Sequence, residues 1–89
     1  MSLKVGDIVF FIYQKDEEPI LWAGKIIEQP NGSAKIVTYL NKQVNMNIPV
    51  LDLFRDFDSG VAAFRERFSN GSPNLDELID LMQYLRAKV

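Results

Sequence analysis

A short hydrophobic run near the N-terminus constrains the fold of this chain more than any other segment. Residues 8–13 read Ile-Val-Phe-Phe-Ile-Tyr. The run is rich in β-branched and aromatic residues and is too short for a helix, so it predicts a β-strand. Because side chains alternate between the two faces of a strand, both faces of this one are apolar. We therefore expect a sheet core on one face and a helix or a binding groove on the other.

Three more segments have the composition of strands, and turn-forming residues separate them. They cover residues 20–27, 34–40 and 43–48. Pro-Asn-Gly at 30–32 is a strong turn signal, and consecutive strands joined by tight turns favour an antiparallel, curled sheet. Gly24, inside the second segment, predicts a bulge or a close backbone approach. Residues 50–54 suit either a short fifth strand or a 3₁₀ turn.

The hydrophobic period then changes to that of helices. The expected helices cover about residues 59–69 and 73–88. The second has two alternative starts, a Ser72 cap followed by Pro73 or an Asn74 cap with Glu77 three residues later. Its apolar stripe consists of Leu75, Leu78, Ile79, Met82 and Leu85. We expect this stripe to pack on the sheet, and the alternative is a helix that binds a partner protein.

These elements predict a mainly β fold with C-terminal α structure. We expect a five-stranded antiparallel barrel over about residues 4–54, followed by the two helices. Eighty-nine residues suffice for one domain and are too few for two. We expect residues 1–89 to form a single domain of a larger protein.

Composition argues against an enzyme. The chain has no Cys and no His, which removes thiolate zinc sites and the commonest general base at neutral pH. Asp52, Asp56 and Asp58 precede the first helix, but Arg67 stands where a calcium loop would end in Glu, so we interpret these acids as capping or solvated. No segment approaches the roughly 20 apolar residues of a membrane span. The sequence predicts a binding module without catalytic residue, metal, cofactor or membrane partner.

Aromatic residues are the remaining candidates for a binding site. Trp22, the only tryptophan, follows an acidic loop at 16–18; Tyr13 precedes that loop, and Tyr39 ends the third strand segment. Aromatic faces attract alkylammonium groups by cation–π interactions worth about 0.5–2 kcal/mol each. The alternative for Trp22 is ordinary packing in a small core. The acidic loop is either a solvated tip or a rim that attracts a cationic ligand.

Three segments carry a resemblance to a known family. They are 4–10 (Lys-Val-Gly-Asp-Ile-Val-Phe), 20–26 (Ile-Leu-Trp-Ala-Gly-Lys-Ile) and 36–41 (Ile-Val-Thr-Tyr-Leu-Asn). In order, they are similar to the opening strand, the Pro-Trp-Trp-Pro-Ala-Lys-Val segment and the aromatic third strand of PWWP domains. The resemblance spans nearly the whole chain, and the broader group of Tudor and chromo barrels shares the architecture.

The resemblance implies an SH3/Tudor-like barrel whose aromatic cage binds a methylated lysine of a histone tail. By position, Trp22 corresponds to the family's second tryptophan and Tyr39 to its third-strand aromatic. The third wall falls at Pro19, and Tyr13 or Phe11 are candidates to replace it. The implied partner is a histone tail peptide or a nucleosome, and the implied localisation is nuclear.

The resemblance also implies contact with DNA, for which Lys25 and Lys42 are the candidate residues. A net charge of −2 argues against nucleic acid as the sole partner, so we expect this contact to be weak. The alternative function is a protein–protein interaction module of a nuclear complex. Such a module would use the same fold without a working cage and bind its partner through the C-terminal helix.

Overall fold

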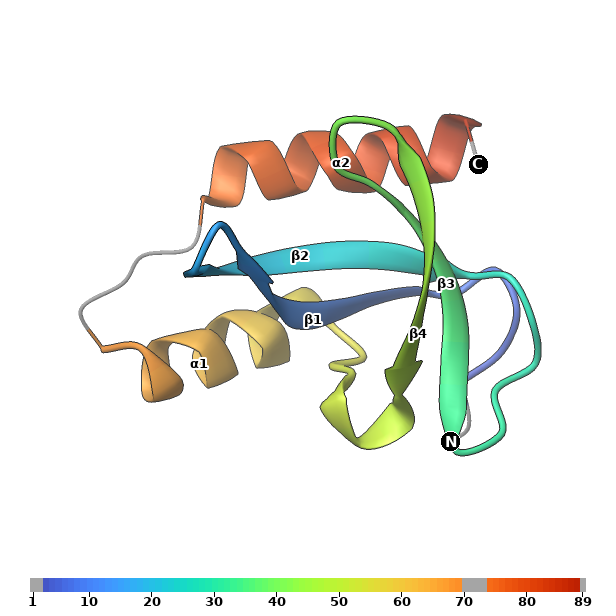
Figure 1. Ribbon diagram of the computed structural model, residues 1–89, viewed down its shortest axis with the longest axis horizontal. Coiled ribbons are helices and arrows are strands. Elements are labelled where there is room, and N and C mark those ends of the chain that lie inside the picture. The colour runs from blue at the N-terminus through green and yellow to red at the C-terminus, as the bar shows by residue number, and fades with distance from the viewer. Residues whose placement is uncertain (1–2, 70–73, 89) are drawn as a thin grey trace.

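Four antiparallel strands form a single sheet in the order β1-β2-β3-β4 (Figure 1). The computed structural model describes residues 3–69 and 74–88. The strands are β1 (Ile8–Lys15), β2 (Glu18–Ile26), β3 (Ser33–Tyr39) and β4 (Gln43–Pro49), and the helices that follow are α1 (Phe57–Arg67) and α2 (Leu75–Lys88). The prediction of a mainly β fold with an antiparallel sheet and two C-terminal helices is confirmed. α1 begins and ends two residues earlier than expected, and α2 begins two residues later than expected.

β1 and β2 form a long hairpin that ends in a two-residue turn. Lys15 pairs with Glu18, and Asp16 and Glu17 between them have φ angles of 51° and 68°. Positive φ at both central residues is the geometry of a type I′ turn, which matches the twist of the flanking strands. Asp16, Glu17 and Glu18 are exposed. The acidic segment is therefore a solvated hairpin tip, shorter than the loop expected from the sequence.

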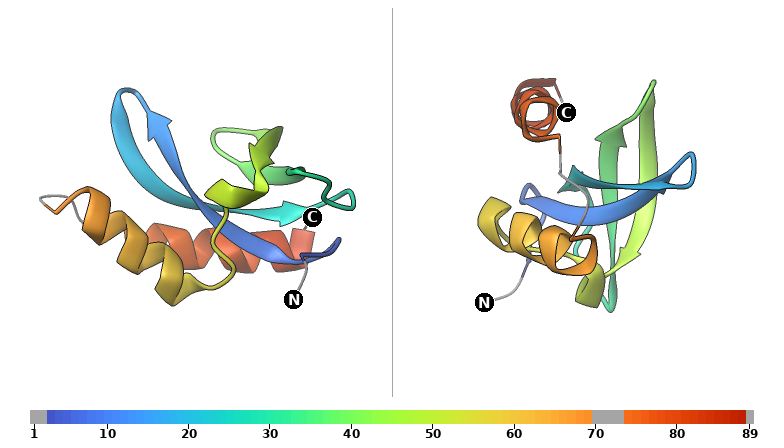
Figure 2. Two further views of the ribbon diagram at one scale, coloured as in Figure 1. Left: turned by 90° about the horizontal axis from the view of Figure 1, so that it is seen from below. Right: turned by 90° about the vertical axis from the view of Figure 1, so that its left-hand side faces the viewer.

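β2 and β3 pair over a short stretch and then diverge. Their paired residues are Lys25↔Val37 and Ile26↔Ile36. Beyond this point the hydroxyl of Thr38 donates a hydrogen bond of 2.5 Å to the carbonyl oxygen of Ala23. One residue further, Trp22 Nε1 donates to the carbonyl oxygen of Tyr39 at 3.1 Å. Side-chain hydrogen bonds thus connect the diverging strands, and α2 packs along this part of β2 (Figure 2).

The segment after β4 does not form the predicted fifth strand. Val50–Asp52 is a 3₁₀ helix, η1, which was the alternative prediction for this segment. Phe54 then makes a single-residue bridge to β1: the Phe10 N–H donates to Phe54 O at 2.9 Å, and the Phe54 N–H donates to Phe10 O at 2.8 Å. Because the chain enters α1 directly afterwards, this pairing extends no further and the sheet has four strands.

The two apolar faces of β1 are covered by different parts of the molecule, as predicted. On one face Phe10 packs edge-to-face on Phe57 of α1, with ring centroids 5.9 Å apart. Gly60 permits this close approach, because a Cβ there would lie 3.2 Å from the Cβ of Phe10. On the other face Val9 and Phe11 are buried in the main hydrophobic cluster. A helix therefore covers one face and the sheet core the other.

α2 begins at the second of its two predicted caps. Asn74 Oδ1 accepts a hydrogen bond from the backbone N–H of Glu77 at 3.4 Å, and Asn74 Nδ2 donates to Glu77 Oε2 at 2.7 Å. This reciprocal pair is a variant of the capping box, with Asn as the cap and Glu at the third helical position. The alternative cap at Ser72 and Pro73 lies outside the described residues.

The buried face of α2 differs from the predicted apolar stripe. Leu78, Leu81 and Leu85 are buried, whereas Ile79 is 45% exposed. The prediction is wrong for Ile79, whose place in the core is taken by Leu81.

Neither described helix combines the length and the apolar character that a membrane span requires.

The N-terminal cap of α1 leads to a prediction about pH. The backbone N–H of Ser59 donates to Asp56 Oδ1 at 2.7 Å, and this bond, helped by the Ser59 side chain, holds the pKa of the Asp56 carboxyl below its usual value. A carboxyl with a lowered folded-state pKa stabilises the fold above its unfolded pKa, and that contribution is lost as pH falls through the folded pKa, below about pH 4.

We expect Asp56→Asn to lose less of its thermal midpoint than the wild type between about pH 6 and about pH 3, because the amide does not titrate. Thermal unfolding followed by circular dichroism measures this difference. Asp58→Asn is the matched control, since it removes a charge from the same turn without removing the cap. Equal acid sensitivity of wild type and Asp56→Asn would contradict the prediction.

Candidate functional site

A pocket of about 340 Å³ opens where β2 and β3 diverge beside α2. It is lined by Trp22, Tyr39, Leu40, Glu77, Asp80, Leu81 and Tyr84. Trp22 comes from the middle of β2, Tyr39 ends β3 and Leu40 directly follows it, and the other four come from one face of α2. The structure therefore brings together Trp22 and Tyr39, the two residues given the principal binding role by the sequence.

Trp22 forms the inner wall of this pocket and is mostly buried. Only 6% of its surface is exposed, and its Nε1–H is engaged by the carbonyl oxygen of Tyr39. The hydrogen bond fixes the plane of the indole, and burial among core residues prevents it from rotating outward. Both alternatives for Trp22 therefore apply in part, since it packs in the core and presents a narrow strip of its ring to the pocket.

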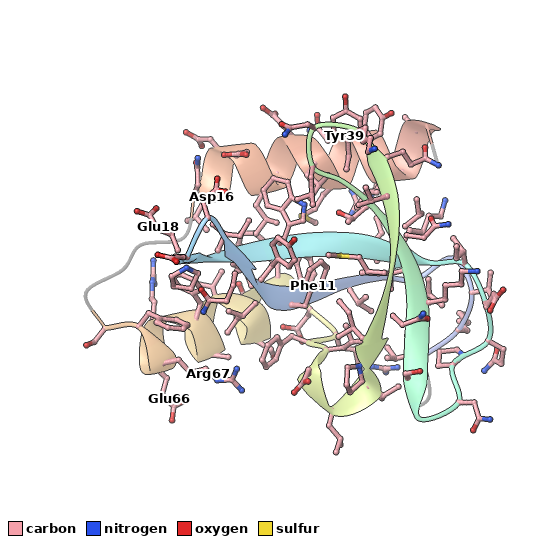
Figure 3. All side chains as sticks on the ribbon, viewed as in Figure 1. Phe11, Asp16, Glu18, Tyr39, Glu66 and Arg67 are labelled. Carbon is pink, nitrogen blue, oxygen red and sulfur yellow. The ribbon has the colours of Figure 1, made fainter. Side chains whose placement is uncertain are left out.

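Two tyrosines form the outer aromatic wall. The rings of Tyr39 and Tyr84 lie with centroids 5.1 Å apart and planes inclined by 47°, and each residue is 37% exposed. Figure 3 shows the Tyr39 side chain beside α2, at the end of β3. The contact joins the end of β3 to the second half of α2, so Tyr39 is held in place from both sides.

Acidic side chains line the same pocket. Glu77 and Asp80 are exposed residues on the face of α2 that carries Tyr84, at positions three and four residues apart along the helix. Among the residues that the structure describes, no Lys or Arg belongs to this lining. Aromatic faces, two carboxylates and the apolar side chains of Leu40 and Leu81 are a combination suited to an organic cation with apolar substituents.

The other cage candidates lie elsewhere. Phe11 and Tyr13 line a second cavity of about 460 Å³, together with residues of β4 and of the end of α1. Phe11 is opposite Trp22 in the strand register, but it is 2% exposed and lies well away from Tyr39 (Figure 3). Pro19 pairs with Gln14 near the hairpin tip and lines neither cavity. The structure does not bring these three residues to the pocket at Trp22.

The candidate DNA contacts are also separate from the pocket. Lys25 is half-buried near the end of β2, and Lys42 is exposed in the turn between β3 and β4. Neither lines the pocket at Trp22. Their role in binding DNA stays a prediction.

Sequence reasoning missed the contribution of α2. Tyr84 and Asp80 lie outside the apolar stripe, where a helix normally faces solvent. The available signal was an aromatic residue on the polar face of an amphipathic helix, four residues after an acid.

Within the described ranges, no cluster of three or more acidic side chains has the arrangement of a metal site. Comparisons of the chain with protein-family models, with curated proteins and with solved structures find no match.

Proposed function

We propose that this chain is a binding module whose pocket at Trp22, Tyr39 and Tyr84 takes the alkylammonium group of a methylated lysine. The observation that carries the proposal is the meeting of three aromatic side chains and two carboxylates around one opening. A methylated ammonium is cationic and apolar at once, so it gains from aromatic faces, from carboxylates and from apolar contact.

The balance of these contributions predicts weak binding. Tyr39 and Tyr84 are partly exposed, so each ring contributes at the lower end of the cation–π range, about 0.5–1 kcal/mol. Exposed carboxylates add about 0.2–1 kcal/mol each. With the apolar contacts of the lysine stem, a Kd of roughly 0.1–1 mM is the expected range for a short peptide.

The partner we propose is a lysine-rich peptide such as a histone tail, which places the module in the nucleus. Its positive charge complements the pocket and the net charge of −2 of the chain. The resemblance to PWWP domains agrees with this role. The isolated Phe10–Phe54 bridge returns the chain to β1, which is compatible with an SH3/Tudor-like barrel in which a bridge takes the place of a fifth strand. DNA contact through Lys25 and Lys42 is a weaker, auxiliary part of the proposal.

A second candidate function uses the outer face of α2. Ile79 is 45% exposed there and belongs to no pocket lining described above, so it favours a protein partner that docks on the helix. This function does not need methyl-lysine. It is the one to retain if methylated and unmethylated peptides both leave the pocket undisturbed.

Tyr84→Ala provides the test of the pocket. We expect it to weaken binding of a trimethyl-lysine peptide by about three- to tenfold, because it removes one ring and loosens Tyr39. Tyr84→Phe keeps the ring and should bind within about twofold of the wild type. Binding is followed by NMR through the indole N–H resonance of Trp22, which is unique in the chain.

Tyr13→Ala is the matched control, since it removes a tyrosine from the other cavity. A neutral analogue of trimethyl-lysine, with carbon in place of nitrogen, should bind more weakly than the cation. Equal binding of the neutral analogue, or of Tyr84→Ala and Tyr13→Ala, would rule out recognition of the cation at this pocket.

A further inference from the structure

We propose that a second pocket, between β1, the start of α1 and α2, binds the C-terminal residue of a partner polypeptide through its carboxylate and an apolar side chain. The pocket has a volume of about 290 Å³ and shares no lining residue with the pocket at Trp22. It is lined by Ile8, Phe10, Arg55, Asp56, Phe57, Met82 and Arg86. The inference therefore goes beyond the function proposed above and does not depend on it.

One wall of this pocket is apolar and is held in place by core packing. Phe10 is 3% exposed, and its ring meets the ring of Phe57 edge-to-face, with centroids 5.9 Å apart. Ile8 and Met82 are half-buried and pack against the main hydrophobic cluster. An apolar group that replaces water against this wall gains free energy by removing apolar surface from solvent.

Two arginines line the same pocket. Arg55 directly precedes the cap of α1 and Arg86 lies near the end of α2, so two distant segments of the chain bring their side chains to one opening. Both are exposed, and the described part of the chain gives neither guanidinium an ion-pair partner. In a chain with a net charge of −2, two unpaired guanidinium groups at one pocket indicate an anionic ligand.

Asp56, the acid among the described residues of the lining, is already used by the fold. Its Oδ1 accepts a hydrogen bond of 2.7 Å from the backbone N–H of Ser59 at the start of α1. It forms no ion pair with either arginine within the described residues. Two guanidinium groups outnumber one carboxylate, so the described lining has a net positive charge.

The combination of charge and apolar surface identifies the kind of anion. A phosphate group has no apolar part to cover Phe57 and Met82, and two cationic side chains are a small footprint for a nucleic acid. A C-terminal residue with an apolar side chain supplies both parts at once. Its carboxylate can accept charge-assisted hydrogen bonds from the arginines while its side chain enters the pocket.

The size of the pocket agrees with this ligand. Its volume lies just below the range of small-molecule sites, about 300–1,000 Å³, so it suits one terminal residue better than a larger molecule. Because both arginines are exposed, each should strengthen binding by only about two- to fivefold. A Kd of roughly 0.3–3 mM is therefore expected for a short peptide.

The test uses the full chain with labelled methionine methyl groups and the peptide acetyl-Gly-Gly-Leu with a free C-terminus. In an NMR titration we expect the Met82 methyl resonance to shift, whereas the methyl of Met46, which lines the cavity at Phe11 and Tyr13, should not. The same peptide with a C-terminal amide should bind at least about fivefold more weakly, because it lacks the charge. Acetyl-Gly-Gly-Gly should bind at least about threefold more weakly, because it lacks the apolar side chain.

Variants of the arginines test the same contacts from the protein side. Arg55→Gln and Arg86→Gln should each weaken the free-acid peptide by about two- to fivefold, and the double variant by about five- to twentyfold. Arg86→Lys keeps the charge and should lose less than Arg86→Gln. Arg65→Gln is the matched control, since Arg65 is an exposed arginine of α1 outside the lining, and it should bind within about twofold of the wild type.

Four results would overturn the proposal. They are equal binding of the free-acid and amidated peptides, a loss with Arg65→Gln as large as with Arg86→Gln, tighter binding of a short DNA duplex at Met82, and binding of isocaproic acid as tight as that of the peptide. The last would identify the ligand as a free small acid. Unchanged thermal midpoints show that the variants are folded, and none of these results bears on methyl-lysine binding at Trp22.

Discussion

Trp22→Ala is expected to destabilise the domain by about 3–5 kcal/mol, the usual cost of deleting a large buried aromatic side chain. Trp22 is 6% exposed and belongs to the main hydrophobic cluster. Its removal also eliminates the hydrogen bond to Tyr39 O, which acts with the bond from Thr38 to Ala23 O to connect β2 to β3 where they diverge. Chemical denaturation followed by circular dichroism measures the loss.

Trp22→Phe is the matched variant for this prediction. It keeps an aromatic ring but removes the N–H donor, and we expect it to cost about 1–3 kcal/mol, the range for a lost hydrogen bond and a small cavity. If Trp22→Ala unfolds at the same denaturant concentration as the wild type, the indole contributes little to the core. The buried position assigned to it would then be contradicted.

The size of this effect determines how the binding site can be tested. A domain of this length has a total stability of roughly 5–13 kcal/mol, so Trp22→Ala removes a large part of it. Loss of binding by that variant would therefore report unfolding as readily as loss of a ligand contact. Tyr84 and Asp80 are the better test positions, because they line the pocket and are exposed at the surface of α2.

Local patterns predicted most of the architecture. The apolar run 8–13 and the alternating segments after it specify strands, because alternation and β-branched residues are properties of a few neighbouring positions. The cap at Asn74 and Glu77 was likewise predictable, since both partners lie within one turn. The structure does not have the predicted fifth strand. The pairing of Phe54 with Phe10 stops after one bridge because α1 begins soon afterwards, and the residues of segment 50–54 do not by themselves specify where that helix begins.

The candidate site was predictable only in part, for the same reason. Trp22 and Tyr39 were found because each stands at a recognisable place on a strand. Tyr84 joins them through a ring contact between residues 45 positions apart along the chain, which depends on how α2 sits against β2. The helical period restricts the buried face of α2 but does not decide between Ile79 and Leu81, and that choice sets the direction in which Asp80 and Tyr84 point.

The second large effect is expected at Gly24, where Gly24→Ala should destabilise the domain by about 1–3 kcal/mol through overpacking. Gly24 pairs regularly with Val9, so the β1–β2 register has no bulge at this position, and the predicted close approach is the relevant feature. A Cβ at this position would lie 2.6 Å from Ile36 Cδ1 and 3.1 Å from the carbonyl oxygen of Val37. Ile36 is fully buried and cannot move away freely. Denaturation midpoints of wild type and variant measure the cost.

The contribution of Ile36 to this clash can be isolated with a double-mutant cycle. Ile36→Val removes Cδ1 and alone should cost about 0.5–1.5 kcal/mol. Combined with Gly24→Ala it should relieve the shortest contact, so the double variant is expected to be more stable than the sum of the single effects by at least about 0.5 kcal/mol. Additive effects would instead assign the cost to the contacts that Ile36→Val leaves in place, the carbonyl oxygen of Val37 and the Cβ of Ile36 at 3.2 Å. Val37 pairs with Lys25 at the last backbone pairing before β2 and β3 diverge. In either case, the missing side chain at Gly24 allows β3 to cross β2 closely enough for Tyr39 to reach Trp22.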